Sequence, residues 1–446
     1  KIFISNKMKK IIYRLIISLI LIVSFSIIYL STIGIKTEKF NDLIVSKIRE
    51  VDPNFSLRIN QVSVKLNPFS LLINLKTLGT DLIYKNKTIK LENIKSQISI
   101  QSVINGKFAL SEIMISTKSI PIKNLISLVR AIKNDPKLLL AEQFIEDGYI
   151  IADLMFEFNE VGNIKKNFKI NGLVNNAQLS LTKNKIDKLN FIFQITDKEL
   201  DFKDIRLLIN SKSLSIPELK AKKQKNKFFF AGSLNNKDLN FKENEIKEFI
   251  DNEFLKTNLN NITFNSDSKF TFNIDKNFKI KDLDIKSEIN IKKLEINNFF
   301  GKNSFLPKMK NDIIFEKQKI KLSYTKNKFD IIGSGNIFLQ DNLDNINYKI
   351  INNEGNYLFN INLNINDNPF IFDFINFEKD IKTNLELKIE GTLKKDILGF
   401  DQITLLENKN VLSIKNLKLS NDYRIEEIEK IQLDYTDTTK RKNQLK

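Results

Sequence analysis

Tyr357-Leu-Phe-Asn-Ile-Asn-Leu-Asn-Ile365 is the stretch that decides the fold, because apolar and polar side chains alternate along almost its whole length. The apolar positions are Tyr357, Phe359, Ile361, Leu363 and Ile365. Between them stand asparagines, with Leu358 as the exception. Successive side chains of a strand point to opposite faces of a sheet. The stretch therefore predicts a β-strand with one apolar face and one amide-rich face.

The same period of two recurs along the chain from Phe55 onward. Further examples are Leu57 with Ile59, Val62 with Val64 and Leu66, Phe191 with Phe193 and Ile195, Phe270 with Phe272 and Ile274, and Leu385 with Leu387 and Ile389. Pairs such as Asn105-Gly106, Asp147-Gly148 and Asn171-Gly172 lie between such runs and supply the positive φ that tight hairpin turns need. The pattern predicts a long succession of antiparallel hairpins.

Helical spacing is confined to a few short segments. Residues 36–54 predict an amphipathic helix, with Phe40, Leu43, Ile44 and Ile48 on its apolar side. Two helical insertions are expected in the β-rich region, near residues 122–145 and 243–255.

No linker rich in Pro, Gly or Ser divides the chain, which holds 13 Gly and 7 Pro in 446 residues. Residues 55–446 are therefore expected to form one continuous β-rich region. About 25 strands, stacked at about 4.8 Å each, would make a sheet on the order of 120 Å long.

The N-terminus predicts a membrane anchor. Residues 11–35 are almost wholly apolar and exceed the about 20 residues that a spanning helix needs. The cations before and within this run are Lys7, Lys9, Lys10 and Arg14. They place residues 1–10 in the cytoplasm and the remaining chain outside. A cleaved signal peptide is the alternative, but its apolar core is usually only about 7–15 residues, and no Ala-x-Ala site follows here.

The first residue is not Met, which leaves two alternatives: Met8 is the start of the protein, or the sequence is part of a longer one.

The composition excludes most familiar catalytic designs. The chain contains no His, no Cys and no Trp, so it has no Ser-His-Asp triad, no Cys-His pair and no usual structural zinc site. Its 71 Lys and Arg against 53 Asp and Glu give a net charge of +18, which is compatible with an anionic partner. The abundance of Lys, Asn and Ile is equally typical of an AT-rich genome. We expect no enzyme activity and no cofactor or metal.

Three local patterns invite chemical interpretations and favour plainer ones. Gly333-Ser-Gly335 lacks the remaining elements of a phosphate loop and is expected to be a turn. Asp282 and Asp284 alternate along a predicted strand and are expected to face water. The lysines from Lys220 to Lys227 precede Phe228-Phe-Phe230, a mixture of cations and aromatic rings. Export behind a membrane anchor argues against a nucleic-acid site. The alternatives are a solvated hairpin, which we favour, and a contact with anionic lipid head groups.

The apolar face of so many strands must be hidden, either by pairing two sheets or by curling one sheet around another molecule. We expect a mostly β fold in which one elongated, curled antiparallel sheet forms a hydrophobic groove. Its candidate lipid-contacting residues are Phe191, Phe193, Ile195, Phe270, Phe272, Ile274, Tyr357, Phe359, Ile361, Leu363 and Ile365.

At this point several segments carry a resemblance. After the anchor and helix come Val62-Ser-Val-Lys-Leu-Asn-Pro-Phe69 and Ser102-Val-Ile-Asn-Gly-Lys-Phe108, which resemble the start of AsmA-like proteins. Ile145-Glu-Asp-Gly-Tyr-Ile-Ile151, Phe168-Lys-Ile-Asn-Gly-Leu-Val174 and Gln178-Leu-Ser-Leu181 are similar to the YhdP branch, which is related to TamB. The resemblance rests on the order of strands and turns and covers most of the chain.

That family resemblance implies an inner-membrane protein whose periplasmic β-groove moves phospholipid toward the outer membrane, and it carries no catalytic residues. This chain departs from the long members by its length and by the charged stretch Thr439-Lys-Arg-Lys-Asn443. Either the sequence is a piece of a longer protein or a partner at the outer membrane or in the periplasm completes the span.

The alternative function is a periplasmic scaffold or assembly factor that guides outer-membrane proteins by strand addition.

Overall fold

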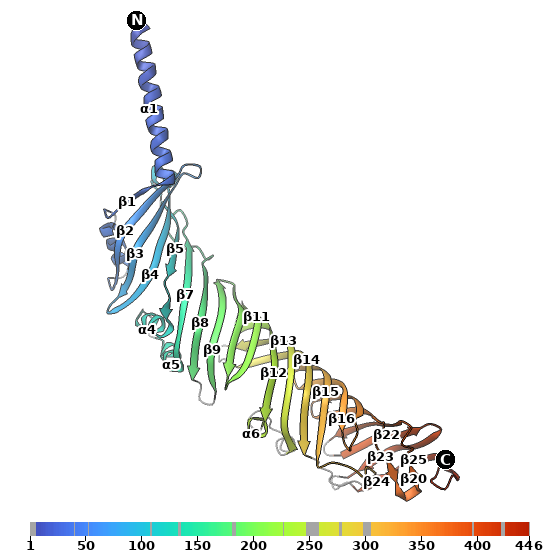
Figure 1. Ribbon diagram of the computed structural model, residues 1–446. Coiled ribbons are helices and arrows are strands. Elements are labelled where there is room, and N and C mark those ends of the chain that lie inside the picture. The colour runs from blue at the N-terminus through green and yellow to red at the C-terminus, as the bar shows by residue number, and fades with distance from the viewer. Residues whose placement is uncertain are drawn as a thin grey trace. The chain divides into compact units, whose positions relative to one another are not determined.

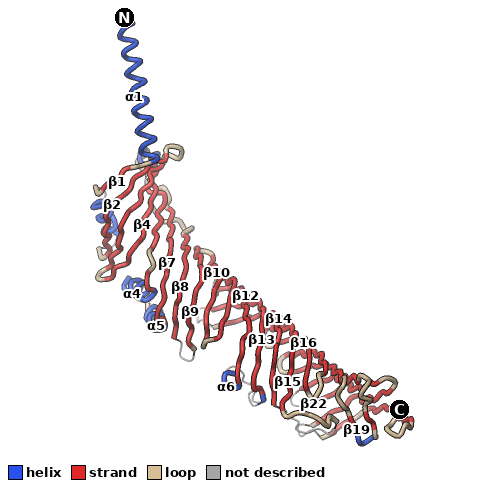
Figure 2. The backbone as a smooth tube through the Cα atoms, viewed as in Figure 1, coloured by secondary structure: helices blue, strands red, loops and turns tan. Residues whose placement is uncertain are grey.

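The computed structural model describes residues 6–39, 41–51, 53–107, 109–132, 135–180, 184–225, 227–246, 258–275, 279–297, 305–394, 397–420 and 424–445. The chain is mostly β, as Figures 1 and 2 show. Of the 26 strands in these residues, 24 form one antiparallel sheet and the other two form a separate two-stranded sheet. The chain divides into two compact units, residues 1–211 and 212–446, and each is described by itself.

The first unit begins with helix α1 (Asn6–Thr32), whose stretch from Lys10 to Thr32 is long and apolar enough to cross a membrane. None of that stretch is buried against the rest of the structure. Ser26 and Ser31 donate their hydroxyls to carbonyls four residues earlier, so these polar side chains are satisfied within the helix. The helix ends at Thr32, three residues before the end of the predicted span at residue 35, and Gly34 follows with φ of 72°.

Ten strands of the first unit follow one another in chain order across the sheet. They are β1 (Ile35–Thr37), β2 (Phe55–Asn67), β3 (Leu72–Tyr84), β4 (Lys87–Ser99), β5 (Leu110–Thr117), β6 (Ile120–Pro121), β7 (Ile145–Glu157), β8 (Lys169–Ser180), β9 (Lys185–Thr196) and β10 (Glu199–Ile209). Each pairs antiparallel with its neighbour, and β5 and β6 both pair with β7.

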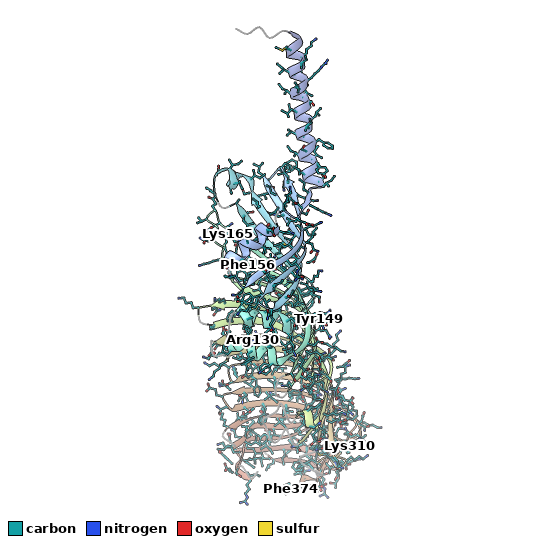
Figure 3. The ribbon with its side chains drawn as sticks, turned by 90° about the vertical axis from the view of Figure 1, so that its left-hand side faces the viewer. Arg130, Tyr149, Phe156, Lys165, Lys310 and Phe374 are labelled. Atoms are coloured by element: carbon teal, nitrogen blue, oxygen red, sulfur yellow. The ribbon has the colours of Figure 1, made fainter. Side chains whose placement is uncertain are left out.

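Four helices accompany these strands: α2 (Asn41–Val51), α3 (Ile100–Ile104), α4 (Ile122–Ile132) and α5 (Pro136–Phe144). Ile44 and Val45 of α2 pack against a core of Leu57, Ile59 and Val62 on β2. Leu128 of α4 is buried in a second core with apolar side chains of β3, β4 and β6. Helices α4 and α5 lie side by side next to β7 (Figure 2), and Arg130 of α4 (Figure 3) forms a 2.8 Å ion pair with Glu142 of α5.

The second unit continues the same meander. Its strands are β11 (Lys212–Gln224), β12 (Lys227–Lys242), β13 (Leu259–Asp275), β14 (Ile280–Asn297), β15 (Asp312–Thr325), β16 (Lys328–Phe338), β17 (Asp344–Asn353), β18 (Asn356–Ile365), β19 (Ile371–Phe372), β20 (Phe377–Glu378), β21 (Leu385–Lys394), β22 (Ile397–Glu407), β23 (Asn410–Leu419), β24 (Ile425–Glu427), β25 (Lys430–Thr436) and β26 (Lys442–Leu445). Helix α6 (Glu243–Ile246) and the 3-10 helix η1 (Asp373–Ile375) complete the described elements.

The regular meander of the second unit is interrupted between β18 and β21, and again where β24 and β25 both pair with β23. Strand β18 pairs with β21, so β19, η1 and β20 lie in the connection between these two neighbours. β22 and β23 run at a steep angle to β12–β16 in Figure 1, so the sheet bends within this unit.

Hairpin turns set the register because their backbone twist matches that of the strands. Between β17 and β18, Asn353 pairs with Asn356, and the two turn residues Glu354 and Gly355 both have positive φ, 52° and 85°. This is the geometry of a type I′ turn. It places the odd-numbered residues of the quoted stretch on one face of the sheet.

Several local expectations are corrected. Residues 36–54 do not form one helix: residues 35–37 form β1, which pairs with β2, and α2 begins at Asn41. Of the expected turns, Asn105-Gly106 follows α3, which was not predicted, with Gly106 at φ of 66°. Asp147-Gly148 is instead an irregularity inside β7, at a register shift.

Gly172 and Gly333-Ser-Gly335 lie inside strands β8 and β16, so the turn expected at each of them is wrong. The hairpin expected at the lysine cluster is confirmed, because Gln224 of β11 pairs with Lys227 of β12 and the lysines are exposed. The helix expected at residues 243–255 is described only as far as Ile246, and the rest lies outside the described residues.

Candidate functional site

The candidate residues of β9 lie in the first unit and belong to a packed core. Phe193 is buried together with Ala152, Val174 and Ala177, while Phe191 and Ile195 are half-buried against them. These side chains share one face of the sheet as predicted, and they contact protein more than they line open space.

The candidate residues of β13 lie on the sheet of the second unit. Phe272 stacks on Phe230 of β12 with ring centroids 4.9 Å apart, and Phe270 lies opposite Gly232. All three candidates, Ile274 included, are half-buried, because the next strands cover only their edges.

The five candidates of β18 differ along the strand. Ile365 is fully buried, whereas Tyr357, Phe359, Ile361 and Leu363 remain half-buried. Leu363 and Ile365 line the largely apolar cavity described next.

The cavity, which we call the terminal pocket, has a volume of about 640 Å³ and lies against β18, β21, β22, β23, β25 and β26 in the second unit. Directly paired leucines cross six strands in one line, the leucine row: Leu363, Leu387, Leu405, Leu412, Leu433 and Leu445. Two positions away along each strand runs the isoleucine row: Ile361, Ile389, Ile403, Ile414 and Ile431. All of these except Ile361 line the pocket, and Ser413 is the one polar residue among its described lining.

The opposite side of the pocket comes from the connection between β18 and β21, residues 366–384, which we call the plug segment. Phe370, Phe372, Phe374 and Ile375 of this segment line the pocket. Phe305, from the described residues before β15, packs edge-on against Phe372 with ring centroids 5.0 Å apart, and its carbonyl accepts a hydrogen bond from the Ile371 amide. Phe374 (Figure 3) is 90% exposed at the tip of the segment.

The plug segment is fastened to strand β25 as well. The Tyr435 hydroxyl donates a 2.8 Å hydrogen bond to the Ile375 carbonyl, and the Tyr435 ring packs edge-on against Phe377. Ile365, Phe370, Phe377, Leu385 and other buried side chains form the closed end of the pocket.

A buried polar network holds the two ends of the plug segment. At the first end, Asp344 of β17 accepts hydrogen bonds from the Asn366 amide and the Asn368 side chain, at 3.0 and 2.8 Å. At the second end, the Lys379 ammonium donates to the carbonyls of Asn366 and Asp380. Glu407 of β22 accepts from the Asp380 amide at 2.8 Å. The network therefore connects the plug segment to strands β17 and β22.

Burial dominates the electrostatics of this network. It raises the pKa of the Asp344 carboxyl, against the lowering effect of its hydrogen bonds. It lowers the pKa of the Lys379 ammonium, against the carboxylates of Glu407, Asp367 and Asp344. Removing one member of such a set strands an uncompensated buried charge, which costs about 3–5 kcal/mol.

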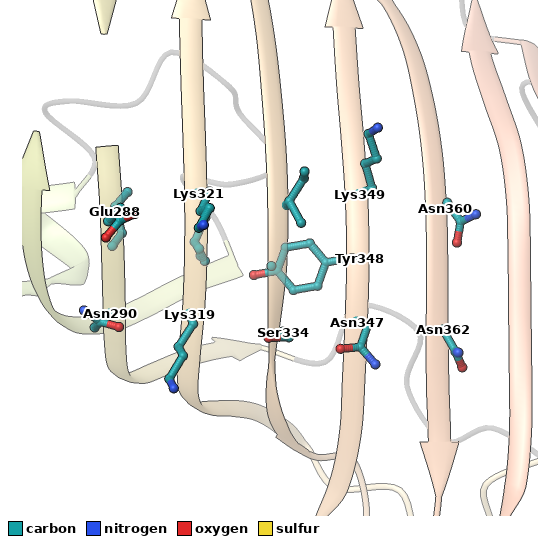
Figure 4. A pocket seen from close by; sticks show the side chains of 14 residues that line it. Glu288, Asn290, Lys319, Lys321, Ser334, Asn347, Tyr348, Lys349, Asn360 and Asn362 are labelled. Carbon is teal, nitrogen blue, oxygen red and sulfur yellow. The ribbon is translucent and has the colours of Figure 1, made fainter. Parts of the chain in front are cut away.

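The other face of the second unit is polar. A hollow of about 620 Å³ crosses β14–β18 there (Figure 4), with Lys319, Lys321 and Lys349 among its lining residues. Tyr348 also borders the hollow, but its pairing with Ile361 places its side chain on the apolar face, where the ring crosses β16 at Gly333 and burial raises the pKa of this tyrosine to about 12. Lysine, amide and glutamate side chains at such a hollow offer charge and hydrogen-bond contacts.

The remaining residues singled out from the sequence lie on strand β14 and helix α1. Asp282 lies in β14 and accepts a 2.9 Å hydrogen bond from Asn273, while Asp284 is half-buried on the same strand. Lys10 and Arg14 are exposed on α1; Lys7 and Lys9 lie in the same helix, but their side chains lie outside the described residues. In the described part of the chain, no group of three or more His, Cys, Asp or Glu side chains is placed to hold a metal.

Sequence reasoning missed the wall of the terminal pocket beyond β18 and the plug segment. The alternation of Leu387 with Ile389, Ile403 with Leu405 and Leu412 with Ile414 was a usable signal for the wall. The sequence of the plug segment carried no such signal, because Phe370, Phe372 and Phe374 alternate as the residues of a further strand would.

No protein-family model matches this chain, and no curated protein matches it in sequence.

Proposed function

We propose that α1 anchors this protein in the bacterial inner membrane and that its β-rich region lies in the periplasm, where it shelters phospholipid acyl chains and passes them toward the outer membrane. The observation that carries the proposal is the terminal pocket with its leucine and isoleucine rows. These rows present aliphatic side chains with one polar residue among the lining. The resemblance to AsmA-like proteins points the same way.

The energetics suit a lipid tail. Each buried CH₂ group contributes about 0.8 kcal/mol, so about ten of them gain about 8 kcal/mol without any polar contact. A head group remains in water, because the pocket offers it almost no hydrogen-bonding partner.

The half-exposed apolar side chains of β18 extend the same surface beyond the pocket. Phe359 and Ile361 lie on the pocket side of the strand, four and two residues from Leu363. Apolar surface that is neither covered by protein nor scattered singly marks a binding surface. We propose that this surface leads tails into and out of the terminal pocket.

The test is site-specific photocrosslinking in the full chain. A photoreactive benzoylphenylalanine at Phe359 should capture phospholipid in cells, detected as a mass increase of the protein. The matched control replaces Leu358, the adjacent and 48% exposed residue whose side chain points to the opposite face of β18. Equal capture at both positions, or none at Phe359, contradicts lipid sheltering.

A second arm asks whether the apolar face is required. Phe359→Asp with Ile361→Asp should abolish the lipid adduct at a third position, Tyr357, while Ile332→Asp with Leu358→Asp, two exposed apolar residues of the other face, should leave it intact. Adducts with envelope proteins and none with lipid would instead support an assembly factor that acts by strand addition.

A further inference from the structure

The terminal pocket has a closed end and an open end along the strand direction. At the closed end, Ile365 and Leu385 are 0% exposed beneath the plug segment. At the other end, Ile431 of the isoleucine row lines the pocket and is 38% exposed. A molecule that enters the pocket therefore enters from the isoleucine-row side and is stopped at the plug segment.

The dimensions match one hydrocarbon chain. Leu412 and Leu417 of β23 both line the pocket, and five residues of strand span about 17 Å. One leaflet of the about 30 Å hydrocarbon layer is about 15 Å thick, which is the reach of one acyl chain. The volume of about 640 Å³ also lies in the range of about 300–1,000 Å³ that small-molecule pockets occupy.

The chemistry of the lining excludes other occupants. A peptide strand, a nucleotide or a sugar would bury hydrogen-bonding groups against aliphatic side chains, which costs about 1–3 kcal/mol for each unpaired group. A linear alkyl chain has no such groups.

We propose that the terminal pocket binds one acyl chain tail-first, with its methyl end against Phe372 and Ile375 of the plug segment. The plug segment then sets the longest chain that is fully buried. This rests on the proposed function and adds to it a site, a ligand orientation and a length limit.

The buried network gives the plug segment the stiffness that a length limit requires. Asn366 and Lys379 are linked by a hydrogen bond across the base of the segment, and Asp344 and Glu407 join the two ends to β17 and β22. A segment held at both ends in this way defines a fixed depth.

The experiment measures the affinity of the full chain, held in an amphipathic polymer, for saturated fatty acids of increasing length below their micellar concentrations. The chain contains no Trp, so Phe374→Trp supplies a single fluorescent reporter within the pocket lining, at its 90% exposed position on the plug segment. Binding should tighten about fourfold for each added CH₂, which corresponds to about 0.8 kcal/mol, and then reach a plateau.

Truncating a side chain of the plug segment that lines the pocket should move the plateau. Phe372→Ala removes a pocket-lining ring and should shift the plateau to longer chains, and Phe372→Leu should shift it less in the same direction. Phe272→Ala on β13 removes a ring outside the pocket and should leave the plateau unchanged.

The outcomes separate the two proposals. Affinity that rises without a plateau, or a plateau that Phe372→Ala and Phe372→Leu leave in place, overturns the tail-first pocket while lipid capture at Phe359 still stands. No fatty-acid binding together with no lipid capture at Phe359 overturns both.

Discussion

Glycine and aromatic residues act as pairs at the residue scale. Four glycines inside strands each lie directly opposite an aromatic residue of the neighbouring strand: Gly172 with Phe193, Gly232 with Phe270, Gly333 with Tyr348 and Gly391 with Phe359. In every pair, a Cβ on the glycine would lie within 3.0 Å of the ring. The missing side chain is the space that the ring occupies, so these glycines are required for packing and not for a turn.

Replacing such a glycine should therefore be costly. At Gly333 the nearest ring atom, Cζ of Tyr348, would lie 2.2 Å from the new Cβ. We expect Gly333→Val to lower the free energy of unfolding by about 1–3 kcal/mol, measured by urea denaturation with circular dichroism. Ser334→Val, the next residue on the other face of the same strand, should change it by less than about 0.5 kcal/mol. Adding Tyr348→Ala to Gly333→Val should recover part of the loss; equal stability of Gly333→Val and Ser334→Val would refute the packing role.

A buried carboxyl gives a second residue-scale prediction. Because burial raises the pKa of Asp344 in the folded state, the folded protein binds this proton more readily than the unfolded chain. The contribution of Asp344 to stability is then present below its unfolded pKa and is lost as pH rises through the folded pKa. Relative to Asp344→Asn, the wild type should gain stability as pH falls from neutral to about pH 4.

Urea denaturation of both proteins across that pH range measures the difference. Asp437→Asn is a control of opposite sign, because hydrogen bonds from Thr439 and Arg441 lower the pKa of Asp437. The wild type should lose stability relative to that variant as pH falls. If the difference in the free energy of unfolding between wild type and Asp344→Asn does not depend on pH, burial does not raise the pKa of Asp344.

At the element scale, strands were predictable and their partners were not. The period of two in residues 357–365 predicted β18, which spans Asn356–Ile365. Glycines misled the prediction at Gly172 and Gly333, because a glycine that makes room for a ring and a glycine that permits positive φ are the same letter in a sequence. The register across six strands that aligns the leucine row depends on turns and on the β18–β21 connection, which local periodicity does not contain.

The plug segment shows the same limit in another way. Phe370, Phe372 and Phe374 alternate like strand residues, yet β19 is only two residues long. Its conformation depends on Asp344, Glu407 and Tyr435, which are distant in sequence and meet it only after the sheet has formed. Tertiary contacts outweigh local propensity there.

At the scale of the whole molecule, the described chain combines one long apolar helix with a large antiparallel sheet. The 23 residues of α1 from Lys10 to Thr32 span about 34 Å at about 1.5 Å per residue, enough for the about 30 Å hydrocarbon layer. In the second unit, the leucine and isoleucine rows lie on one face of the sheet and the polar hollow lies on the other. This division is what the proposed function requires: an anchor in a bilayer and an apolar surface for a lipid tail outside it.

The proposed topology follows from the charges that flank α1. Lys10 and Arg14 stand at its N-terminal end, with Lys7 and Lys9 before them, whereas Lys36 and Lys39 on the far side accompany Glu38. By the positive-inside rule, we propose that the N-terminus stays in the cytoplasm and that both β units are exported. The chain has no Cys, so a single introduced thiol reports its own compartment.

Labelling by a membrane-impermeant maleimide tests this orientation in cells whose outer membrane alone has been permeabilised. Lys225→Cys, in the exposed β11–β12 hairpin, should react while the inner membrane is intact. Lys10→Cys should react only after the inner membrane is broken. Because both positions are exposed lysines, a difference in labelling reports the compartment and not the burial of the side chain. The reverse pattern would place the β units in the cytoplasm, where a groove for lipid in transit to the outer membrane has no use.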